Sequence, residues 1–141
     1  MKQKLFIIIF AIFLVSLIIY SKFIIKNKSN IVLDTQTNSE GSVIVEITPP
    51  QDILENFNIW RFSVNLNTHS IELTEDLTKI SVLIDDKGKI YNPESWDGSP
   101  VGGHHRSGFL LFKAINPLPK TLTLSIKEIG SIKNRDFSWK F

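Results

Sequence analysis

The feature that most constrains the fold is an alternation of apolar and polar residues that recurs from residue 43 to the end of the chain. Val43, Val45 and Ile47 share one parity, and Pro49-Pro50 ends this first run. The later runs have the apolar positions Trp60, Phe62, Val64 and Leu66, then Ile80, Val82 and Ile84, then Leu122, Leu124 and Ile126, and finally Phe137, Trp139 and Phe141. A period of two places alternate residues on one face of a β-strand. The sequence therefore predicts short strands with one buried face.

These runs predict an all-β domain in residues 42–141. Together with the apolar stretch 109–114 and a hairpin turn at 85–89, they give about seven strands at intervals of roughly 8–15 residues. Apart from a turn near residues 51–56, no segment after residue 41 has convincing helical periodicity. Ten phenylalanines and three tryptophans are available to fill a core. We therefore predict an antiparallel, immunoglobulin-like β-sandwich.

A separate apolar segment precedes this domain. Leu5 to Ser21 contains no charged residue, and a snorkelling Lys22 extends the apolar span over residues 5–25. Such a span covers roughly 31 Å of helix at about 1.5 Å per residue, which matches a hydrocarbon core of about 30 Å. A helix buried in a protein core would carry a polar stripe, which this segment lacks. A cleaved secretory signal would end in small residues, whereas this segment ends in the bulky run Leu17-Ile18-Ile19-Tyr20-Ser21-Lys22. We therefore predict an uncleaved, single-pass transmembrane helix preceded by a short flank at residues 1–4.

Residues 26–41 are rich in Asn, Ser, Thr and Lys, which predicts a polar tether between the anchor and the sandwich. The lysines on either side of the span, two before it and three after it, slightly favour a cytoplasmic C-terminal side. A short N-terminus that leads into an anchor usually stays inside, however, and sandwich domains of this kind usually lie outside. We expect a cell-membrane protein whose domain faces the periplasm or the cell exterior.

Charge and cysteine content exclude several classes of function. Residues 1–30 hold five lysines and no acidic residue, whereas residues 31–141 hold 11 basic and 14 acidic residues, a formal charge of −3. A weakly acidic domain lacks the basic footprint that binds phosphate backbones, so no nucleic-acid partner is expected. The chain has no cysteine, which excludes disulfides, thiolate nucleophiles and cysteine-ligated metal centres.

All three histidines fall in two polar patches. His69 lies in the patch at residues 67–77, and His104 and His105 lie in the stretch 96–109, Trp-Asp-Gly-Ser-Pro-Val-Gly-Gly-His-His-Arg-Ser-Gly-Phe. Because loops that follow different strands of a sandwich can meet at one end, the two patches are expected to converge there. If the chain has a chemical site, this is where the sequence predicts it.

One hypothesis for this site is a divalent transition metal. Imidazoles with a carboxylate suit Cu(II), Zn(II) or Ni(II). Adjacent histidines on a regular strand point to opposite faces, so both can face one ion only where the backbone is irregular, which Gly102-Gly103 permits. In this hypothesis Arg106 orients the ligands by hydrogen bonding. The predicted ligand set is His69, His104, His105 and Asp76.

A second hypothesis is a structural lock without any metal. The histidines would then close the loop by hydrogen bonding to backbone carbonyls, and Arg106 would pair with Asp97 or Asp76 through its planar fork of donors. Trp96 would lie as a lid on the core. Gly102 and Gly103 are part of the loop that these contacts would hold closed.

Signals for an enzyme are weak. A hydrolase would need a histidine within hydrogen-bond reach of Ser70, Ser99 or Ser107, with an oxyanion donor nearby. Gly98-Ser99-Pro100 lacks the Gly-x-Ser-x-Gly pattern of a nucleophile elbow. Asp85-Asp86 lacks the spaced oxygen ligands of a calcium loop and is typical of a hairpin turn. We expect no enzymatic activity.

Several short motifs together carry a resemblance. They are Asn67-Thr68-His69-Ser70, Leu73 with Asp76-Leu77, Ser95-Trp96-Asp97-Gly98, Gly102-Gly103-His104-His105-Arg106-Ser107-Gly108, and Arg135-Asp136-Phe137-Ser138-Trp139. With these motifs, residues 43–141 resemble a family of small, uncharacterised prokaryotic envelope proteins marked by Gly-Gly-His-His-Arg. The resemblance implies an N-terminal membrane segment or signal and one immunoglobulin-like β-sandwich domain. It implies no activity, substrate or cofactor.

The sequence as a whole predicts a membrane-anchored, extracytoplasmic β-sandwich that acts as a non-enzymatic binding or interaction module. Its partners are the membrane, through residues 5–25, and a protein or small ligand at the loops of one sandwich end. Binding of Cu(II) or Zn(II) by the histidines is the alternative function, and an envelope hydrolase is the second alternative.

Overall fold

The computed structural model describes Phe6, Phe10 and residues 12–20, 32–56 and 58–141. The chain divides into two compact units, Met1–Ile31 and Val32–Phe141. In the first unit, residues 12–20 are helical, with exposed side chains. The rest of the predicted anchor at 5–25, apart from Phe6 and Phe10, lies outside the described residues, as does the flank at 1–4. No helix in the described part of the chain is long and apolar enough to cross a membrane.

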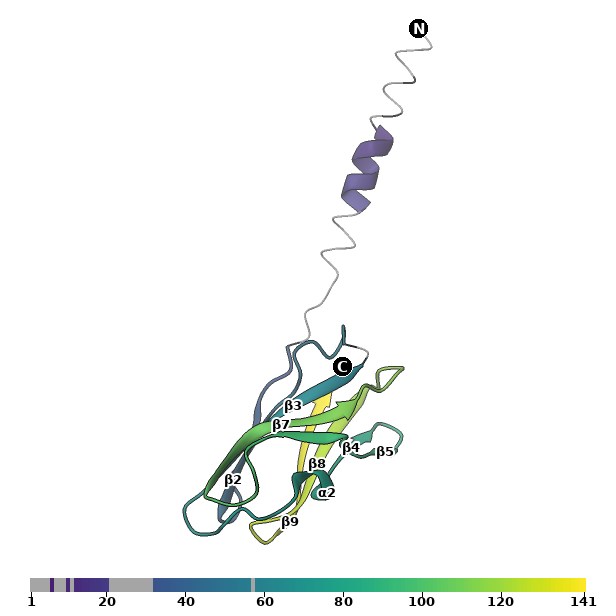
Figure 1. Cartoon of the computed structure of the whole chain (residues 1–141). Coiled ribbons are helices and arrows are strands. Elements are labelled where there is room, and N and C mark those ends of the chain that lie inside the picture. Colours follow the sequence, from purple (N-terminus) through teal and green to yellow (C-terminus); the bar gives the residue numbers. More distant parts are fainter. Residues whose placement is uncertain (1–5, 7–9, 11, 21–31, 57) are drawn as a thin grey trace. The chain divides into compact units, whose positions relative to one another are not determined.

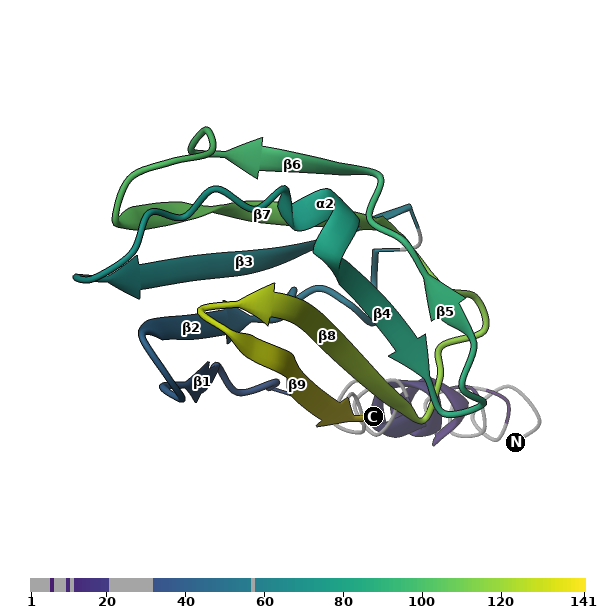
Figure 2. The same ribbon diagram turned by 90° about the horizontal axis from the view of Figure 1, so that it is seen from below.

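The second unit consists of two antiparallel sheets (Figure 1). The first sheet has the order β1-β2-β3-β7-β6. Its strands are β1 (Gln36–Asn38), β2 (Val43–Thr48), β3 (Ile59–Thr68), β7 (His105–Lys113) and β6 (Ser95–Gly98). The second sheet has the order β5-β4-β8-β9, with β5 (Ile90–Tyr91), β4 (Ser81–Asp85), β8 (Thr121–Ile129) and β9 (Ile132–Lys140). Figure 2 shows the two sheets as separate layers, and the prediction of an all-β, sandwich-like domain is confirmed.

The core lies between the two layers and follows the predicted parity in most strands. Phe62 packs against Phe112 on the neighbouring strand and against Trp139 of the opposite sheet, with ring centroids 5.7 Å apart in both pairs. Strand β4 differs from the prediction, because Leu83 is fully buried while Val82 and Ile84 are only half-buried. The other buried residues of the same layers include Val43, Val45, Ile47, Trp60, Val64, Leu66, Leu110, Leu122, Leu124, Ile126 and Phe137.

The domain begins before the predicted boundary at residue 42. Residues 26–31 of the predicted tether lie outside the described residues, but Gln36–Asn38 forms the edge strand β1. Both functional groups of the Gln36 side-chain amide bond to the backbone of Ser138 in β9, at 2.6 and 3.1 Å. The indole N–H of Trp139 donates to the Asp34 carbonyl at 2.8 Å. Side chains from β1 and β9 thus close the sandwich along this edge, which is why a polar segment belongs to the fold.

The turn at 85–89 forms the predicted hairpin between β4 and β5. Gly88 has a φ of 77°, a conformation that glycine adopts without a steric penalty. Desolvation opposes ionisation of Asp85, but N–H groups of Lys89 and Lys87 and the hydroxyl of Tyr91 donate to its carboxylate. These bonds outweigh the desolvation and leave the pKa of Asp85 below its usual value.

One short helix, α2 (Leu77–Ile80), was not predicted from the sequence. It lies in the connection between β3 and β4, which joins the two sheets (Figure 2). Its four residues are too few to show helical periodicity, so the pattern alone cannot reveal it. Leu77 anchors the helix in the core.

Candidate functional site

The two predicted patches lie side by side at one end of the sandwich. The N–H of Thr68 donates to the His104 carbonyl at 2.9 Å. The N–H of Leu73 donates to the Gly103 carbonyl at 2.9 Å, and the N–H of Gly102 donates to the Leu73 carbonyl at 2.7 Å. Because these bonds run in both directions, they join the segments as a short ladder. We call residues 69–76 and 99–105 the loop pole.

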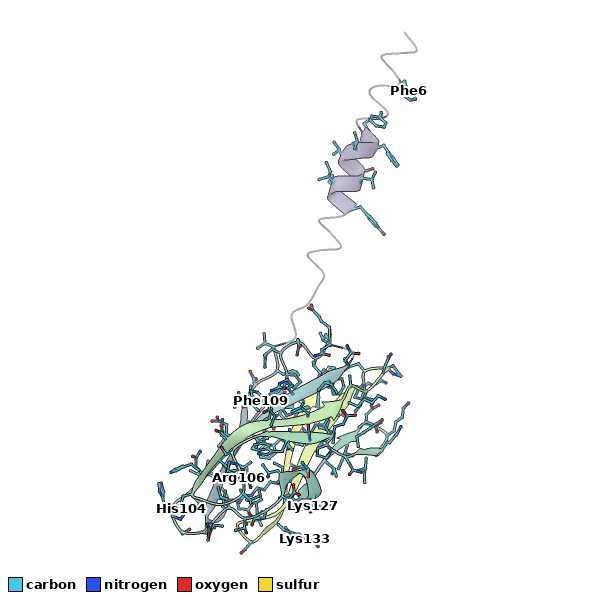
Figure 3. All side chains as sticks on the ribbon, in the orientation of Figure 1. Phe6, His104, Arg106, Phe109, Lys127 and Lys133 are labelled. Atoms are coloured by element: carbon cyan, nitrogen blue, oxygen red, sulfur yellow. The ribbon has the colours of Figure 1, made fainter. Side chains whose placement is uncertain are left out.

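The loop pole lies at the end of the domain opposite the chain termini of the second unit. His104 is at the lower end in Figure 3, whereas the C-terminus is at the upper end in Figure 1, which has the same orientation. The bond from Trp139 to the Asp34 carbonyl places the entering chain beside the last strand. The chain therefore enters and ends at one end of the sandwich and displays the loop pole at the other.

Two of the three histidines are in contact. The rings of His69 and His105 have centroids 5.9 Å apart and planes at 78° to each other. Nδ1 of His105 lies 2.8 Å from Oδ1 of Asn67, the residue opposite it on β3. His104, the next residue along the chain, is exposed and is not part of this pair. This separation follows the alternation of side chains expected for neighbouring residues that enter a strand.

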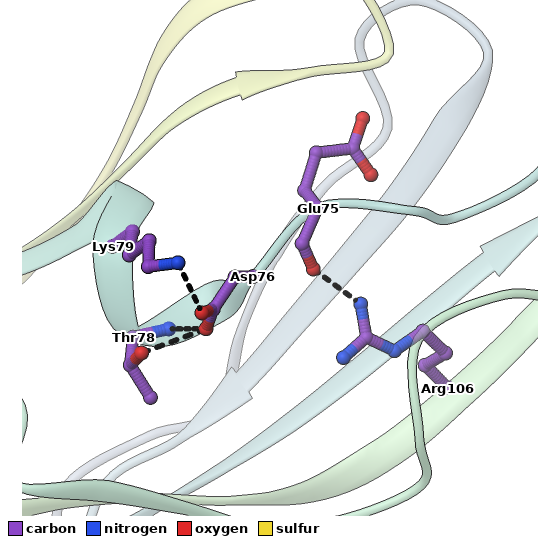
Figure 4. Close-up of polar contacts among 5 residues, drawn as sticks. All are labelled: Glu75, Asp76, Thr78, Lys79 and Arg106. Carbon is purple, nitrogen blue, oxygen red and sulfur yellow. Dashed lines mark hydrogen bonds and ion pairs between the residues drawn. The ribbon is translucent and has the colours of Figure 1, made fainter.

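Asp76 does not join the histidines. Its carboxylate accepts hydrogen bonds from the hydroxyl and the N–H of Thr78, at 2.7 and 3.0 Å, and lies 3.3 Å from Nζ of Lys79 (Figure 4). These contacts, led by the Thr78 hydroxyl, lower the pKa of Asp76. Asp76 is therefore the N-cap of α2.

The predicted four-residue ligand set is accordingly not assembled. Within residues 32–56 and 58–141, where all four side chains are described, no three His, Cys, Asp or Glu side chains form a group that could hold a metal ion. The physical reason is that Asp76 is committed to a helix end while His104 and His105 alternate.

Arg106 is the residue that fastens the loop pole from inside. The residue is only 3% exposed. Its Nη1 donates to the Glu75 carbonyl at 2.7 Å (Figure 4) and also to the Leu73 carbonyl at 3.5 Å. Burial lowers the pKa of Arg106, while the carboxylates of Glu75 and Asp76 act in the opposite direction. Because a guanidinium remains charged in proteins, Arg106 is a buried cation. Its hydrogen-bond acceptors are the two backbone carbonyls.

The partners of Arg106 differ from those predicted. Asp97 instead forms an exposed ion pair with Arg61, whose Nη2 lies 2.8 Å from Oδ2. The Arg61 guanidinium also lies 4.6 Å from the centre of the Phe109 ring. These three side chains lie on the outer face of the first sheet, on the side away from Arg106, because Asp97 and Phe109 are opposite each other in the register.

Trp96 lies on the edge strand β6 of the first sheet, with the Arg106 guanidinium over its ring. The Arg106 guanidinium carbon is 5.7 Å from the indole centre, and the indole N–H donates to the Ser99 carbonyl at 2.8 Å. A Cβ atom on Gly98 or Gly108 would lie 2.6 or 2.7 Å from Cζ2 of this ring. Both glycines are therefore required because the indole occupies the space where their side chains would be.

Gly102 and Gly103 give the loop the shape that the backbone ladder needs. Their φ values are 106° and 76°, in a region that residues with a side chain rarely adopt. Both residues also take part in the ladder to Leu73. The two glycines thus allow the backbone conformation in which this loop forms its hydrogen bonds with Leu73.

A shallow hollow of about 240 Å³ lies on the outer face of the first sheet beside His105. Within it, Nδ2 of Asn65 donates to a carboxylate oxygen of Glu46 at 3.1 Å, next to the Asn67–His105 contact. Its lining residues are Glu46, Asn65, Asn67, His105, Arg106 and Ser107.

Of the three serines considered for a hydrolase, Ser99 has a hydroxyl that bonds to the backbone. The hydroxyl of Ser99 donates to the Ser107 carbonyl at 3.0 Å and accepts from the Ser107 N–H at 3.2 Å, so it fastens β6 to β7. The N–H of Ser70 donates to the hydroxyl of Thr68 at 3.3 Å. The Ser99 hydroxyl is thus part of the pairing of β6 with β7, whereas Ser70 and Ser107 make these contacts through main-chain groups.

Sequence reasoning missed a second buried arginine, Arg135 on β9, which is 1% exposed. It donates to the Glu40 carbonyl at 2.6 Å, to the Ile129 carbonyl at 3.4 Å, and to both the carbonyl and the side-chain oxygen of Asn38. The available signal was its parity, because Arg135 shares a strand face with Phe137 and Trp139.

In comparisons with known proteins, no family model, no curated protein and no solved structure matches the chain.

Proposed function

We propose that this chain is a membrane-anchored, extracytoplasmic binding module that engages a protein partner through its loop pole. The observation that carries the proposal is the combination of a fastened backbone with exposed side chains at this pole. Arg106 and the backbone ladder hold the loops from inside, while Val101 at their tip is 60% exposed. A surface that is ordered before binding loses little conformational entropy when a partner binds.

The arrangement of the strands supports an immunoglobulin-like assignment. The order β2-β3-β7-β6 in one sheet and β4-β8-β9 in the other corresponds to the A-B-E-D and C-F-G orders of that fold. Successive pairs of strands alternate between the sheets, as Greek-key connections require. Domains of this kind commonly bind through the loops at one end.

The apolar sequence of residues 5–25 supports the proposed membrane anchor. The place where the chain enters the domain supports the loop pole as the end that binds a partner. A partner that approaches the loop pole would contact the end of the domain farthest from residue 34, where the chain enters. The weakly acidic charge of residues 31–141 argues against a nucleic acid in this role.

Because the chain contains no cysteine, single-cysteine variants test its orientation directly. Lys87 is exposed at the β4–β5 turn, and Lys87→Cys should react with a membrane-impermeant maleimide in intact cells. The matched control Gln3→Cys should react only after the cells are permeabilised. The reverse pattern would contradict an extracytoplasmic domain.

Partner binding is tested by placing a photocrosslinking amino acid at Val101, with the same amino acid at Lys87 as the control from the other end of the domain. We expect an adduct of one defined mass from position 101 and no such adduct from position 87. Equal adducts at both positions, or none at position 101, would contradict binding through the loop pole.

A further inference from the structure

We propose that His69 and His105 form a two-imidazole site for a divalent transition metal ion, with Cu(II) bound more tightly than Zn(II). This inference goes beyond the proposed function and does not rest on it. Its basis is the one close histidine pair of the loop pole, with ring centroids 5.9 Å apart. The two residues come from neighbouring strands, since His69 directly follows β3 and His105 begins β7.

The separation of the rings suits a shared ion. With metal–nitrogen distances of about 2.0–2.1 Å, two imidazoles have ring centres ~5 Å apart on a tetrahedral ion such as Zn(II), and ~4.5 Å or ~6.4 Å apart in adjacent or opposite positions on a square-planar ion such as Cu(II), so 5.9 Å lies within the range. Both side chains are exposed, and rotation of the His69 side chain alone can aim one of its nitrogens at an ion bound to His105 without moving the backbone. The backbone positions are already fixed by the bond between Thr68 and His104, which lie next to the two ligands in the sequence.

Asn67 prepares His105 for this role. A carboxamide oxygen only accepts hydrogen bonds, so the 2.8 Å contact to Oδ1 of Asn67 places the proton of the neutral ring on Nδ1. Nε2 of His105 then keeps its lone pair, which is the state that a metal ion requires. Histidine ligands in metal sites are commonly oriented by such a hydrogen bond from the other ring nitrogen.

The donor set defines the class of ion. Neutral imidazoles bind borderline divalent ions, for which affinity rises to Cu(II) and then falls at Zn(II). Mg²⁺ and Ca²⁺ prefer oxygen ligands and have no such set here. Two protein ligands leave positions for water, so the site is open on its outer side, next to the hollow that contains Glu46.

The test is calorimetric titration of the untagged full chain in a non-ionic detergent with CuCl₂, ZnCl₂ and MgCl₂. We expect one equivalent of Cu(II), weaker Zn(II) and no Mg²⁺. His69→Ala and His105→Ala should each weaken Cu(II) binding by more than about tenfold. Tenfold is the smallest loss of affinity usual when only the hydrogen-bond partner of a ligand is removed, and removing the ligand itself costs more. Asn67→Ala, which removes that partner, should weaken binding by about tenfold.

His104→Ala is the matched control, since it removes the adjacent imidazole and should leave the Cu(II) affinity unchanged. Circular dichroism checks that each variant folds, which the exposure of all three side chains leads us to expect. Electron paramagnetic resonance of the Cu(II) form should show coupling to two imidazole nitrogens. No Cu(II) binding, binding unchanged in His105→Ala, or an equal loss in His104→Ala would each overturn the proposal.

Discussion

Two arginines are buried at the same end of the sandwich, one in each sheet, and they fasten different parts of the molecule. Arg106 on β7 reaches the carbonyls of Leu73 and Glu75, which lie 33 and 31 positions away in the sequence. Arg135 on β9 reaches Asn38 and Glu40, which lie 97 and 95 positions away. Arg106 therefore holds a loop that displays side chains, whereas Arg135 holds the edge strand β1 and the turn that follows it.

Both arginines close the open end of the β-sandwich by binding carbonyl groups. Loop carbonyls that turn inward there need donors, because a buried and unpaired carbonyl costs about 1–3 kcal/mol. A guanidinium supplies five N–H groups in a plane and satisfies several carbonyls at once. Burial lowers the pKa of both Arg106 and Arg135 because it desolvates each cation, while the carboxylates of Glu75 and Asp76 for Arg106, and of Glu40 for Arg135, act in the opposite direction. The difference lies in the number of acceptors, which is larger for Arg135.

The largest expected effect comes from Arg135→Met, which keeps an apolar side chain of similar length but removes all donors. It leaves the carbonyls of Asn38 and Glu40 without their partner, so we expect a loss of about 4 kcal/mol in the free energy of unfolding. Urea denaturation measures this loss. A loss smaller than that of Arg106→Met would reverse the ranking of the two arginines.

Arg106→Met should cost about 2 kcal/mol, since it orphans chiefly the Glu75 carbonyl. The loss should be accompanied by local opening of the loop pole, whereas β1 stays in place. Urea denaturation gives the magnitude, and limited proteolysis locates the new cleavage sites. Cleavage in residues 34–42, rather than in 69–76 or 99–105, would show that the two arginines do not act on separate parts.

Gly108→Ala separates the two arginines further, because it displaces β6 and the Trp96 indole, which belong to the sheet of Arg106 and not to that of Arg135. The new Cβ would lie 2.5 Å from Gly98 Cα and 2.7 Å from the Trp96 ring, so β6 and the indole must move. We expect a loss of about 1–3 kcal/mol, the range for overpacking. In double-mutant cycles the change should couple to Arg106→Met and be additive with Arg135→Met. Equal coupling to both arginines would contradict a local role for Trp96.

The smallest effect concerns Asp76, which begins α2 just after the carbonyl that Arg106 holds. Its pKa is lowered in the folded state, so its carboxylate stabilises the fold above the unfolded value of 3.8, and this contribution is lost as the pH falls through the folded value. Asp76→Ala should therefore be less stable than the parent chain at pH 7, with a gap that narrows below pH 3.8. Asp76→Asn keeps a capping side chain without the charge and serves as the control. A gap that is independent of pH would contradict this assignment.

The sequence predicted those strands in which the alternation is long and apolar. It identified the inner faces of β2, β3, β8 and β9, because three or four alternate positions in each run are apolar. It missed β6, whose four residues Ser-Trp-Asp-Gly contain only one apolar side chain. It also missed β1, since a three-residue edge strand held by the Gln36 side chain looks like any polar linker.

For the candidate site, the sequence predicted the convergence of two patches but not the roles within them. Parity could have placed Arg106 inside, because it shares a face of β7 with Leu110 and Phe112. The same alternation separates His104 from its neighbour His105 but cannot tell that His69 and His105 meet. Pairing of the strand ends decides that contact, and the pairing depends on the whole register of β3 with β7.

Arg106 holds in place the loop pole on which His69 and His105 lie. Native-state hydrogen exchange at the amides of Thr68, Leu73 and Gly102, the three donors of the backbone ladder, tests this role most directly. These amides should exchange slowly in the parent chain and much faster in Arg106→Met, with amides of β1 unchanged. Fast exchange in the parent chain, or equal protection in the variant, would contradict this role.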